Sequence, residues 1–243
     1  MENLILRKTD SNFLQINHLD NIDSLIDEIF NSVTHNQINF FYLKRQKYRQ
    51  VWELQKKIHE HVKNDKLPDV VLFLEHDHVY TFGKNADEDF LLNSRPSNVD
   101  VVKTDRGGEV TYHGPGQLVG YPIVNLNYYK KSITWFMRSL EQVIIDTLKE
   151  YDLSGKRKDG YPGVWIDDSK ICAMGVRISR WVTMHGFAIN INPDMKYFDG
   201  MIPCGILSHG VTSLKEQIGE DVNNKVLISK FMKNFNQLFK RLN

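Results

Sequence analysis

The order of strand-like and helix-like segments is the feature that most constrains the fold of this chain. Apolar residues recur at helical spacing in residues 44–64, in the stretch that follows Ser132, and in residues 224–242. Short β-rich runs occupy residues 69–74, 79–82, 117–126, 163–166, 171–178 and 185–191. The helices interrupt these strands irregularly, without a repeated strand–helix–strand alternation. The sequence therefore predicts an α+β fold, a single domain with mixed or antiparallel sheets flanked by helices.

The chain has no internal linker rich in Pro, Gly or Ser, so we expect one folded unit. Residues 1–37 are polar and mixed in composition, with a short helix expected at about residues 20–30. We interpret residues 1–37 as an N-terminal extension and residues 38–243 as the main domain.

Charge and composition exclude several classes of function. Lys and Arg total 31, Asp and Glu total 30, and the net charge is +1, so we expect binding neither to nucleic acid nor to an anionic membrane. No apolar run reaches the roughly 18 residues of a membrane span, and the N-terminus lacks the apolar core of a signal peptide. With only two cysteines, Cys172 and Cys204, we expect free thiols in a reducing compartment and a cytoplasmic location.

Residues 106–117, RGGEVTYHGPGQ, form the first candidate site. Glycine occupies positions 107, 108, 114 and 116, and it lets a backbone approach a ligand closely. An irregular loop with tight turns is the plain alternative, and glycine alone favours it. The stretch is neither a P-loop nor a dinucleotide fingerprint, because the required spacing and the following helix are missing. The combination of Arg106, paired glycines, Tyr112 and His113 indicates a binding loop.

Cys204 is the candidate nucleophile. It lies between Pro203 and Gly205 in MIPCG, and these flanks predict a loop, where reactive groups are commonly displayed. The alternative is that it is a small buried hydrophobic residue, as free cysteines usually are. Cys172 lies in the apolar run ICAMGVRI, and we interpret it as a packing residue.

Lys170 is the candidate partner of that thiol. It follows the polar turn at residues 167–169 and precedes an apolar strand. A lysine after a turn is normally a solvated surface residue. At a strand entrance it can instead reach into a pocket, where its ammonium group would favour a neighbouring thiolate.

A metal site is not expected. His76 and His78 stand two positions apart, which places both on one face of a strand, but no further ligands follow at a suitable spacing. We expect His76 or His113 to line a pocket instead.

Four segments together resemble one family, the lipoyl(octanoyl) transferases of lipoate biosynthesis. RGGEVTYHGPGQLVGYPI is similar to the family signature, and GVWIDDSKICAMGVRISRWVTMHGFAININ to its second block. FDGMIPCGI followed by GVTSL resembles the third block. LEHDHVYTFG resembles a segment that usually reads His-Pro-Pro, and it departs at Asp77 and His78. The resemblance covers about residues 42–214.

The resemblance implies a catalytic domain over residues 38–243, with a fold like that of the biotin and lipoate ligases. It implies transfer of octanoyl groups from octanoyl-acyl carrier protein to a lysine of lipoyl domains. The acceptors are E2 subunits of 2-oxoacid dehydrogenases and the glycine cleavage H protein. No cofactor is implied, neither ATP nor a metal.

The resemblance also assigns residues. Cys204 matches the family's acyl-accepting cysteine, and Lys170 matches its acid/base lysine. The matched substrate-binding residues are Arg106, Gly107, Gly108, Glu109, Val110, Thr111, Tyr112, His113, Ala173, Met174, Gly175, Gly186, Phe187 and Ala188. Because each buried methylene favours binding, we expect an apolar tunnel with Val110, Tyr112, Met174 and Phe187 in its wall. Ala188 and the glycines are expected to leave room for the chain.

Two rival functions remain. One is an ATP-dependent ligase of the same fold, which activates free octanoate or lipoate and needs no catalytic cysteine. The other is a non-catalytic protein that binds lipoyl domains or acyl carrier protein. Cys204 in its Pro-Cys-Gly setting favours the transferase over the ligase, and the presence of both candidate catalytic residues favours it over a non-catalytic protein.

Overall fold

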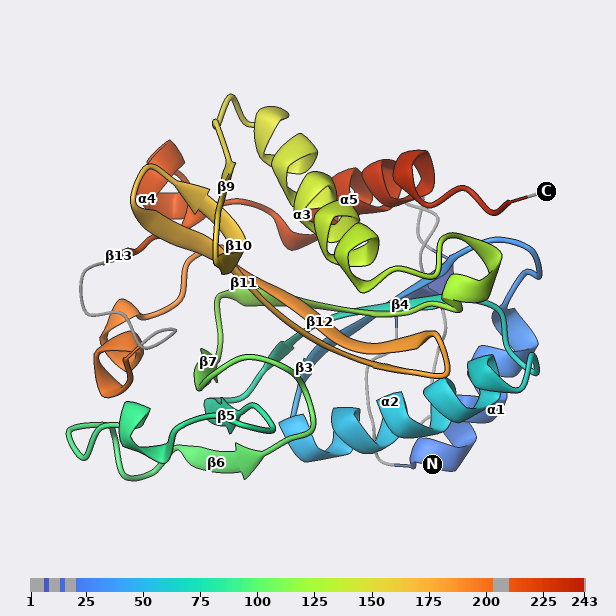
Figure 1. Ribbon diagram of the computed structural model, residues 1–243, viewed down its shortest axis with the longest axis horizontal. Helices are drawn as coiled ribbons and strands as arrows, with labels where there is room; N and C mark the ends of the chain where they lie inside the picture. Colours follow the sequence, from blue (N-terminus) through green and yellow to red (C-terminus); the bar gives the residue numbers. More distant parts are fainter. Residues whose placement is uncertain (1–6, 9–13, 16–20, 203–209, 243) are drawn as a thin grey trace.

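The structure is a computed structural model, and it describes residues 7–8, 14–15, 21–202 and 210–242. The main sheet has the strand order β1-β2-β3-β4-β8-β12-β11-β10-β9, with β13 beside β11, and a smaller sheet has the order β6-β5-β7 (Figure 1). β2, β3 and β4 run parallel to one another, whereas the pairs from β4 through β9 are antiparallel.

The main sheet consists of β1 (Arg7–Lys8), β2 (Leu14–Gln15), β3 (Asn39–Gln46), β4 (Val70–His76), β8 (Gln117–Ile123), β9 (Lys156–Lys158), β10 (Tyr161–Ile166), β11 (Ser169–Ser179), β12 (Val182–Asn190) and β13 (Gly210–Val211). The smaller sheet consists of β5 (Val79–Phe82), β6 (Asp100–Lys103) and β7 (Thr111–His113). The helices are α1 (Ile22–Ser32), α2 (Tyr48–Lys63), α3 (Ile133–Lys149), α4 (Leu214–Ile218) and α5 (Asn224–Leu238), with short 3-10 turns η1 (Glu88–Phe90), η2 (Leu126–Tyr128) and η3 (Met195–Gly200).

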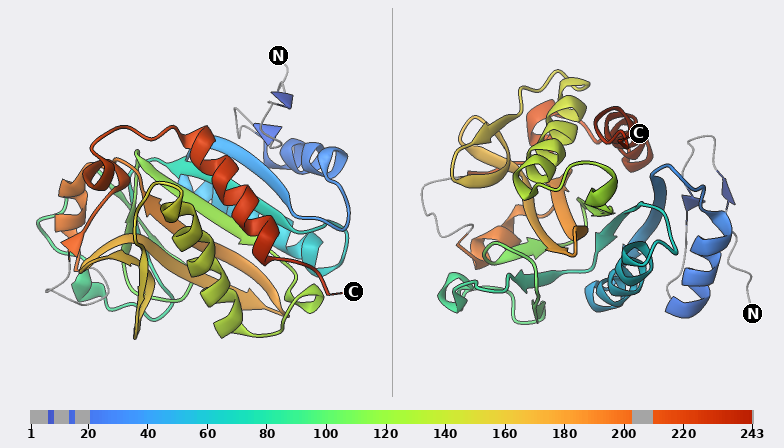
Figure 2. Two further views of the ribbon diagram at one scale, coloured as in Figure 1. Left: turned by 90° about the horizontal axis from the view of Figure 1, so that it is seen from above. Right: turned by 45° about the vertical axis from the view of Figure 1, so that its right-hand side comes forward.

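Helices cover both faces of the main sheet (Figures 1 and 2). On one face, Phe136 of α3 and Phe231 of α5 pack with Phe187 of β12 in the largest apolar cluster. On the other face, α1 and α2 pack on β3, β4 and β8, with Leu54 of α2 fully buried. The predicted α+β fold with mixed sheets flanked by helices is therefore confirmed.

The first long strand differs from the prediction. Residues 39–46 form β3, and the helix predicted from residue 44 begins at Tyr48. β3 is paired in parallel with β4, and residues 39–43 are all buried. A strand that is buried on both faces shows no alternation of apolar and polar residues, which is why the pattern concealed it. The last helix also ends at Leu238, before the predicted residue 242.

The segment before β3 contacts the rest of the fold. Asn21 caps α1 by accepting hydrogen bonds from the backbone N–H groups of Asp23 and Ser24. Leu25, Ile26 and Ile29 of α1 are buried in the same apolar cluster as α2. The division at residue 37 into extension and main domain stays a prediction.

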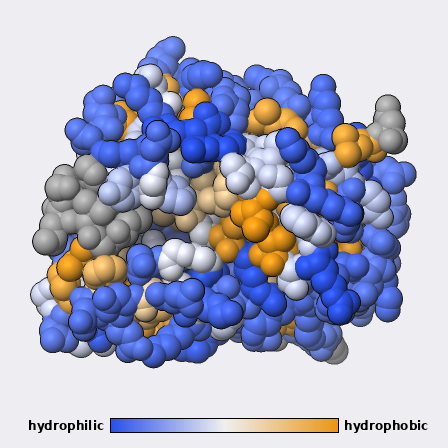
Figure 3. Space-filling view, viewed as in Figure 1, coloured by the Kyte–Doolittle hydropathy of each residue, from blue (hydrophilic) through white to orange (hydrophobic). Residues whose placement is uncertain are grey.

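The long β11–β12 hairpin lies at the centre of the molecule. Figure 3 shows a mainly hydrophilic face with an apolar area over this hairpin. β7 and the loop before it lie beside the hairpin, so the two most distinctive sequence motifs become neighbours. Within the described ranges, no helix has the length and apolar character needed to cross a membrane.

Candidate active site

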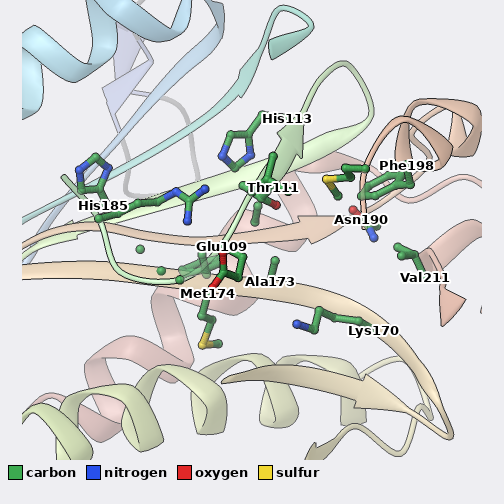
Figure 4. A pocket seen from close by; sticks show the side chains of 18 of the residues that line it. Glu109, Thr111, His113, Lys170, Ala173, Met174, His185, Asn190, Phe198 and Val211 are labelled. Atoms are coloured by element: carbon green, nitrogen blue, oxygen red, sulfur yellow. The ribbon is translucent and has the colours of Figure 1, made fainter. Parts of the chain in front are cut away.

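A cavity of about 80 Å³ lies between the β11–β12 hairpin and the loop that joins β6 to β7 (Figure 4). This volume is several times the roughly 10–15 Å³ that one water-sized group requires. Thirteen of the residues predicted for the site line it: Arg106, Gly108, Glu109, Val110, Thr111, His113, Lys170, Ala173, Met174, Gly175, Gly186, Phe187 and Ala188.

Gly107 and Tyr112 are not among the lining residues. Successive side chains of a strand point to opposite faces, and Thr111 and His113 of β7 both line the cavity. Tyr112 points the other way, where its hydroxyl lies 2.7 Å from His78 Nδ1. Tyr112 is therefore not part of the cavity wall, in contrast to the prediction.

Lys170 is buried at one end of the cavity because a β-bulge turns it away from the apolar core. The pairing of β10 with β11 shifts register, so that Val164 faces Cys172 but Trp165 faces Lys170. Without this shift, alternation would give Lys170 and Cys172 the same face. Ile171 and Cys172 instead both pack into the core on the side of α3 and α5. Lys170 is 7% exposed and lines the cavity.

Two neighbours define the path of the Lys170 side chain. Its Nζ lies 4.7 Å from the centre of the Trp165 ring, within the range of a cation–π interaction. Its Cε lies 3.6 Å from the position that a Cβ atom on Gly163 would occupy. That Cβ atom would also meet the Cys172 carbonyl oxygen at 2.4 Å, so the site requires glycine at position 163. Gly163 is the cross-strand partner of Ala173, so the Lys170 side chain reaches the level of Ala173.

The two cysteines differ in what the structure describes. Cys172 is completely buried, and burial raises the pKa of its thiol. Because the thiolate is the nucleophilic form, Cys172 is a packing residue, as predicted. Cys204 lies outside the described residues. Met201 and Val211, which precede and follow residues 203–209, both line the cavity.

Arg106 anchors the binding loop to the smaller sheet. Its Nη2 donates to the Thr81 carbonyl oxygen at 2.6 Å and to the Thr81 hydroxyl at 3.0 Å. The Gly107 N–H donates to the Val176 carbonyl oxygen at 2.9 Å, which lays the loop on β11. The loop thereby closes one side of the cavity.

Gly175 and Gly186 line the cavity, and each permits a close backbone contact. A Cβ atom on Gly175 would meet the Gly107 carbonyl oxygen at 2.8 Å. A Cβ atom on Gly186 would meet the Gly120 carbonyl oxygen at 2.2 Å. The expectation that these glycines leave room for a chain stays a prediction. The short side chains at the cavity are those of Ala173 and Ala188, which form a cross-strand pair.

A chain of hydrogen bonds connects His113 to the backbone of Lys170. His113 Nδ1 lies 2.7 Å from Gln117 Oε1, and Gln117 Nε2 donates to Asn190 Oδ1 at 2.9 Å. Asn190 Nδ2 donates to the Thr212 carbonyl oxygen at 2.9 Å, and the Thr212 N–H donates to the Lys170 carbonyl oxygen at 3.1 Å. Burial lowers the pKa of His113 to about 3, so its ring is neutral at pH 7. Because Gln117 uses its amino group on Asn190, the ring proton of His113 is on Nδ1.

The other end of the cavity is formed by buried side chains with polar tips, which are Tyr48, Arg106, His113, Tyr121 and His185. His185 Nε2 lies 2.8 Å from Asp105 Oδ1, and Asp105 also pairs with Arg177 at 3.2 Å. Burial lowers the pKa of His185, although Asp105 opposes this shift, so the ring is neutral at pH 7 and donates to the carboxylate. Partial burial raises the pKa of Asp105, but the hydrogen bond from His185 and the charge of Arg177 outweigh it, and the pKa is lowered.

The described part of the chain holds no group of three or more His, Cys, Asp or Glu side chains that could bind a metal ion. His76 lies behind the cavity, with Nδ1 3.0 Å from the Gln46 carbonyl oxygen and Nε2 2.8 Å from the Tyr121 hydroxyl. Of the two histidines expected in a pocket wall, His113 lines the cavity and His76 does not.

Comparison with known proteins identifies the family of this chain. The family described as the lipoyl protein ligase A/B catalytic domain matches residues 47–236. The chain belongs to this family. An octanoyltransferase of Flavobacterium psychrophilum is 45% identical over 213 residues, which are 79% of this chain and 92% of that protein. An octanoyltransferase of Christiangramia forsetii is 44% identical over 213 residues, which are 79% of this chain and 91% of that protein.

A solved structure gives the same fold. The putative lipoate protein ligase Ta0514 of T. acidophilum has a TM-score of 0.63 at 12% identity, over 82% of this chain and 83% of that chain. At this identity the likeness shows the fold alone. The family match and the octanoyltransferase relatives together confirm the predicted resemblance. They also confirm the prediction that the chain is an acyltransferase.

The sequence motifs of this family member did not indicate every lining residue. Those missed are Tyr48, Tyr121, His185, Asn190, Phe198, Met201 and Val211. Six of them lie inside the recognised segments, where the sequence did not reveal the direction of their side chains. Tyr48 begins α2, and no local pattern distinguishes it from a core residue.

Proposed function

We propose that this chain transfers an octanoyl group from octanoyl-acyl carrier protein to a specific lysine of lipoyl domains. The acceptors are E2 subunits of 2-oxoacid dehydrogenases and the glycine cleavage H protein. The octanoyl group is carried as a thioester on Cys204, with Lys170 as acid and base, and the reaction uses neither ATP nor a metal. One observation carries the proposal: a buried lysine at the end of a cavity, in a chain related at 45% identity to an octanoyltransferase.

The cavity supports an acyl substrate. Val110, Ala173, Met174, Phe187 and Ala188 contribute apolar groups to its lining. An octanoyl chain has six methylenes, and burial favours binding by about 0.8 kcal/mol for each, or roughly 5 kcal/mol in total. This term is large enough to hold the chain while its thioester reacts.

The first step forms the acyl-enzyme. The Cys204 thiolate attacks the carbonyl carbon of the octanoyl thioester, and the bond to the carrier's phosphopantetheine sulfur breaks. The leaving thiolate takes a proton from Lys170. One thioester replaces another, so the step is nearly balanced in free energy and requires no ATP.

The second step transfers the acyl group to the acceptor. The lysine amine of the lipoyl domain attacks the Cys204 thioester, the carbon–sulfur bond breaks, and the Cys204 thiolate is restored. Lys170, neutral after the first step, takes the proton that the amine releases. The amide is more stable than the thioester, which drives the reaction forward.

Cys204 is preferred over Cys172 as the acyl carrier for a physical reason. Cys172 is 0% exposed, and burial raises the pKa of its thiol, so its thiolate is rare and inaccessible. Met201 and Val211, which lie on either side of residues 203–209, both line the cavity. A free catalytic thiol also requires a reducing compartment, and we therefore place the reaction in the cytoplasm.

Intact-protein mass spectrometry tests the proposal. The purified protein is incubated with octanoyl-acyl carrier protein without ATP, and its mass and peptide masses are measured. We expect one octanoyl adduct that hydroxylamine removes and that maps to the Cys204 peptide. Cys204→Ala should lose the adduct and Cys172→Ala should keep it. Turnover that needs ATP and free octanoate, and that survives Cys204→Ala, would establish the ligase alternative instead.

A further inference from the structure

His185 is held in the cavity wall by an unusual backbone conformation. It lies on β12 with a φ of 60°. Regular alternation would place its side chain on the face of Phe187, whose ring packs 5.5 Å from Phe231 of α5. The His185 ring instead lies 6.3 Å from the ring of Trp52 on α2 and 6.4 Å from that of Tyr121. Strained backbone of this kind persists where the surroundings enforce it, often at functional sites.

The His185 ring has one hydrogen-bond acceptor to spare. Nε2 carries the proton that Asp105 accepts, so Nδ1 carries a lone pair. Nδ1 is buried and has no hydrogen-bond partner among the described residues. The Tyr121 hydroxyl beside it bonds His76, and the Arg106 guanidinium bonds Thr81. A buried acceptor without a donor is unfavourable, so a ligand that supplies a donor gains affinity.

The two ends of the cavity are separated by about the length of an octanoyl chain. The Lys170 side chain reaches the level of Ala173, and His185 pairs with Val176, three positions (176 − 173) farther along β11. Three residues of a strand span about 10 Å. An extended eight-carbon chain with bonds of about 1.5 Å spans roughly 9 Å. A chain whose carbonyl group lies beside Lys170 therefore ends near Arg106 and His185.

We propose that Arg106 and His185 form a polar end wall that limits the length of the acyl chain, and that His185 Nδ1 accepts a hydrogen bond from a chain whose end carries a hydroxyl group. This inference rests on the proposed octanoyl transfer. A methyl group beyond the eighth carbon presses against a guanidinium group and an imidazole lone pair. A terminal hydroxyl group at the same place donates its proton to His185 Nδ1.

Two acyl donors of equal size test the end wall. Nonanoyl and 8-hydroxyoctanoyl chains have the same number of heavy atoms and differ only in a terminal methyl or hydroxyl group. Each is loaded on acyl carrier protein, and kcat/KM is measured beside that of octanoyl. We expect the wild-type protein to prefer 8-hydroxyoctanoyl over nonanoyl by roughly three- to tenfold, the effect of about one hydrogen bond.

Substitutions at His185 distinguish the effect of the polar end wall from the effect of side-chain volume. His185→Leu has a similar volume without the lone pair, and it should reverse the preference in favour of nonanoyl. His185→Asn should retain the wild-type preference, because asparagine tolerates positive φ and keeps both an N–H for Asp105 and an acceptor oxygen. Val211→Ala, at the Lys170 end of the cavity, is the matched control and should leave the ratio unchanged.

The outcomes are distinguishable. Equal use of the two nine-atom chains by wild type, or an unchanged ratio in a folded His185→Leu protein, overturns the end wall while octanoyl transfer stands. Failure of wild type with octanoyl itself overturns both proposals. Thermal unfolding monitors each variant, and if His185→Leu does not fold, the wild-type ratio and His185→Asn decide.

Discussion

Acid should destabilise this protein from pH 6.5 downward because two buried histidines resist protonation. Burial lowers the pKa of His76 to about 4 and that of His113 to about 3. In the unfolded chain both titrate near 6.5. Since their folded pKa values are depressed, their stabilising contribution is complete above pH 6.5 and is lost as the pH falls toward the folded values. Between pH 7.5 and 5 each loses about 2 kcal/mol, roughly 4 kcal/mol together.

Urea unfolding at pH 7.5, 6.5 and 5.5 measures this effect. Between pH 7.5 and 5.5 the two histidines together lose about 3 kcal/mol, a large part of the 5–15 kcal/mol typical of a folded domain, so the midpoint should move clearly. His76→Gln should remove about half of the pH dependence, whereas Tyr48→Phe, beside both rings, should leave it intact. An unfolding free energy that stays level from pH 6.5 to 5.5 would show that these histidines are not held neutral by burial.

Three further predictions concern the site. Gly175→Ala should lower octanoyl transfer and destabilise the fold by about 1–3 kcal/mol, because its Cβ would meet the Gly107 carbonyl oxygen at 2.8 Å; initial rates and thermal melts check this. Lys170→Arg should fold but lose nearly all turnover, because arginine does not release its proton near neutral pH, and substantial steady-state activity would reject the acid/base role. Cys172→Ala should cost about 1–3 kcal/mol of stability in urea unfolding, yet keep most of its octanoyl-transfer rate.

The sequence predicted those parts of the site in which the backbone itself makes the close contacts. Glycines at positions 175 and 186 each mark a close approach that a side chain would obstruct. The predicted substrate-binding segments, residues 106–113, 173–175 and 186–188, do meet at one cavity. Composition and periodicity were likewise sufficient for the α+β class, because helix faces and buried strands leave strong apolar patterns.

The directions of side chains could not be read from the sequence. Alternation predicts which face a residue occupies only while the backbone stays regular. His185 breaks that rule through its positive φ, and Lys170 breaks it through a bulge in the β10–β11 pair. Tyr112 obeys the rule and for that reason points away from the cavity. A prediction that ignored register therefore misplaced Tyr112 and missed His185.

The bulge beside Lys170 follows from core packing more than from any contact in the cavity. The sequence Lys170–Ile171–Cys172 places two apolar residues in succession at a strand buried beneath helices. A regular strand would bury Cys172 with Lys170 in the core and leave Ile171 on the cavity face. The bulge buries both Ile171 and Cys172, and full burial of an isoleucine side chain contributes about 1.5–3 kcal/mol. It also avoids placing an ammonium group in an apolar core, which is strongly unfavourable. The bulge that stabilises the core therefore also places the Lys170 side chain at the cavity.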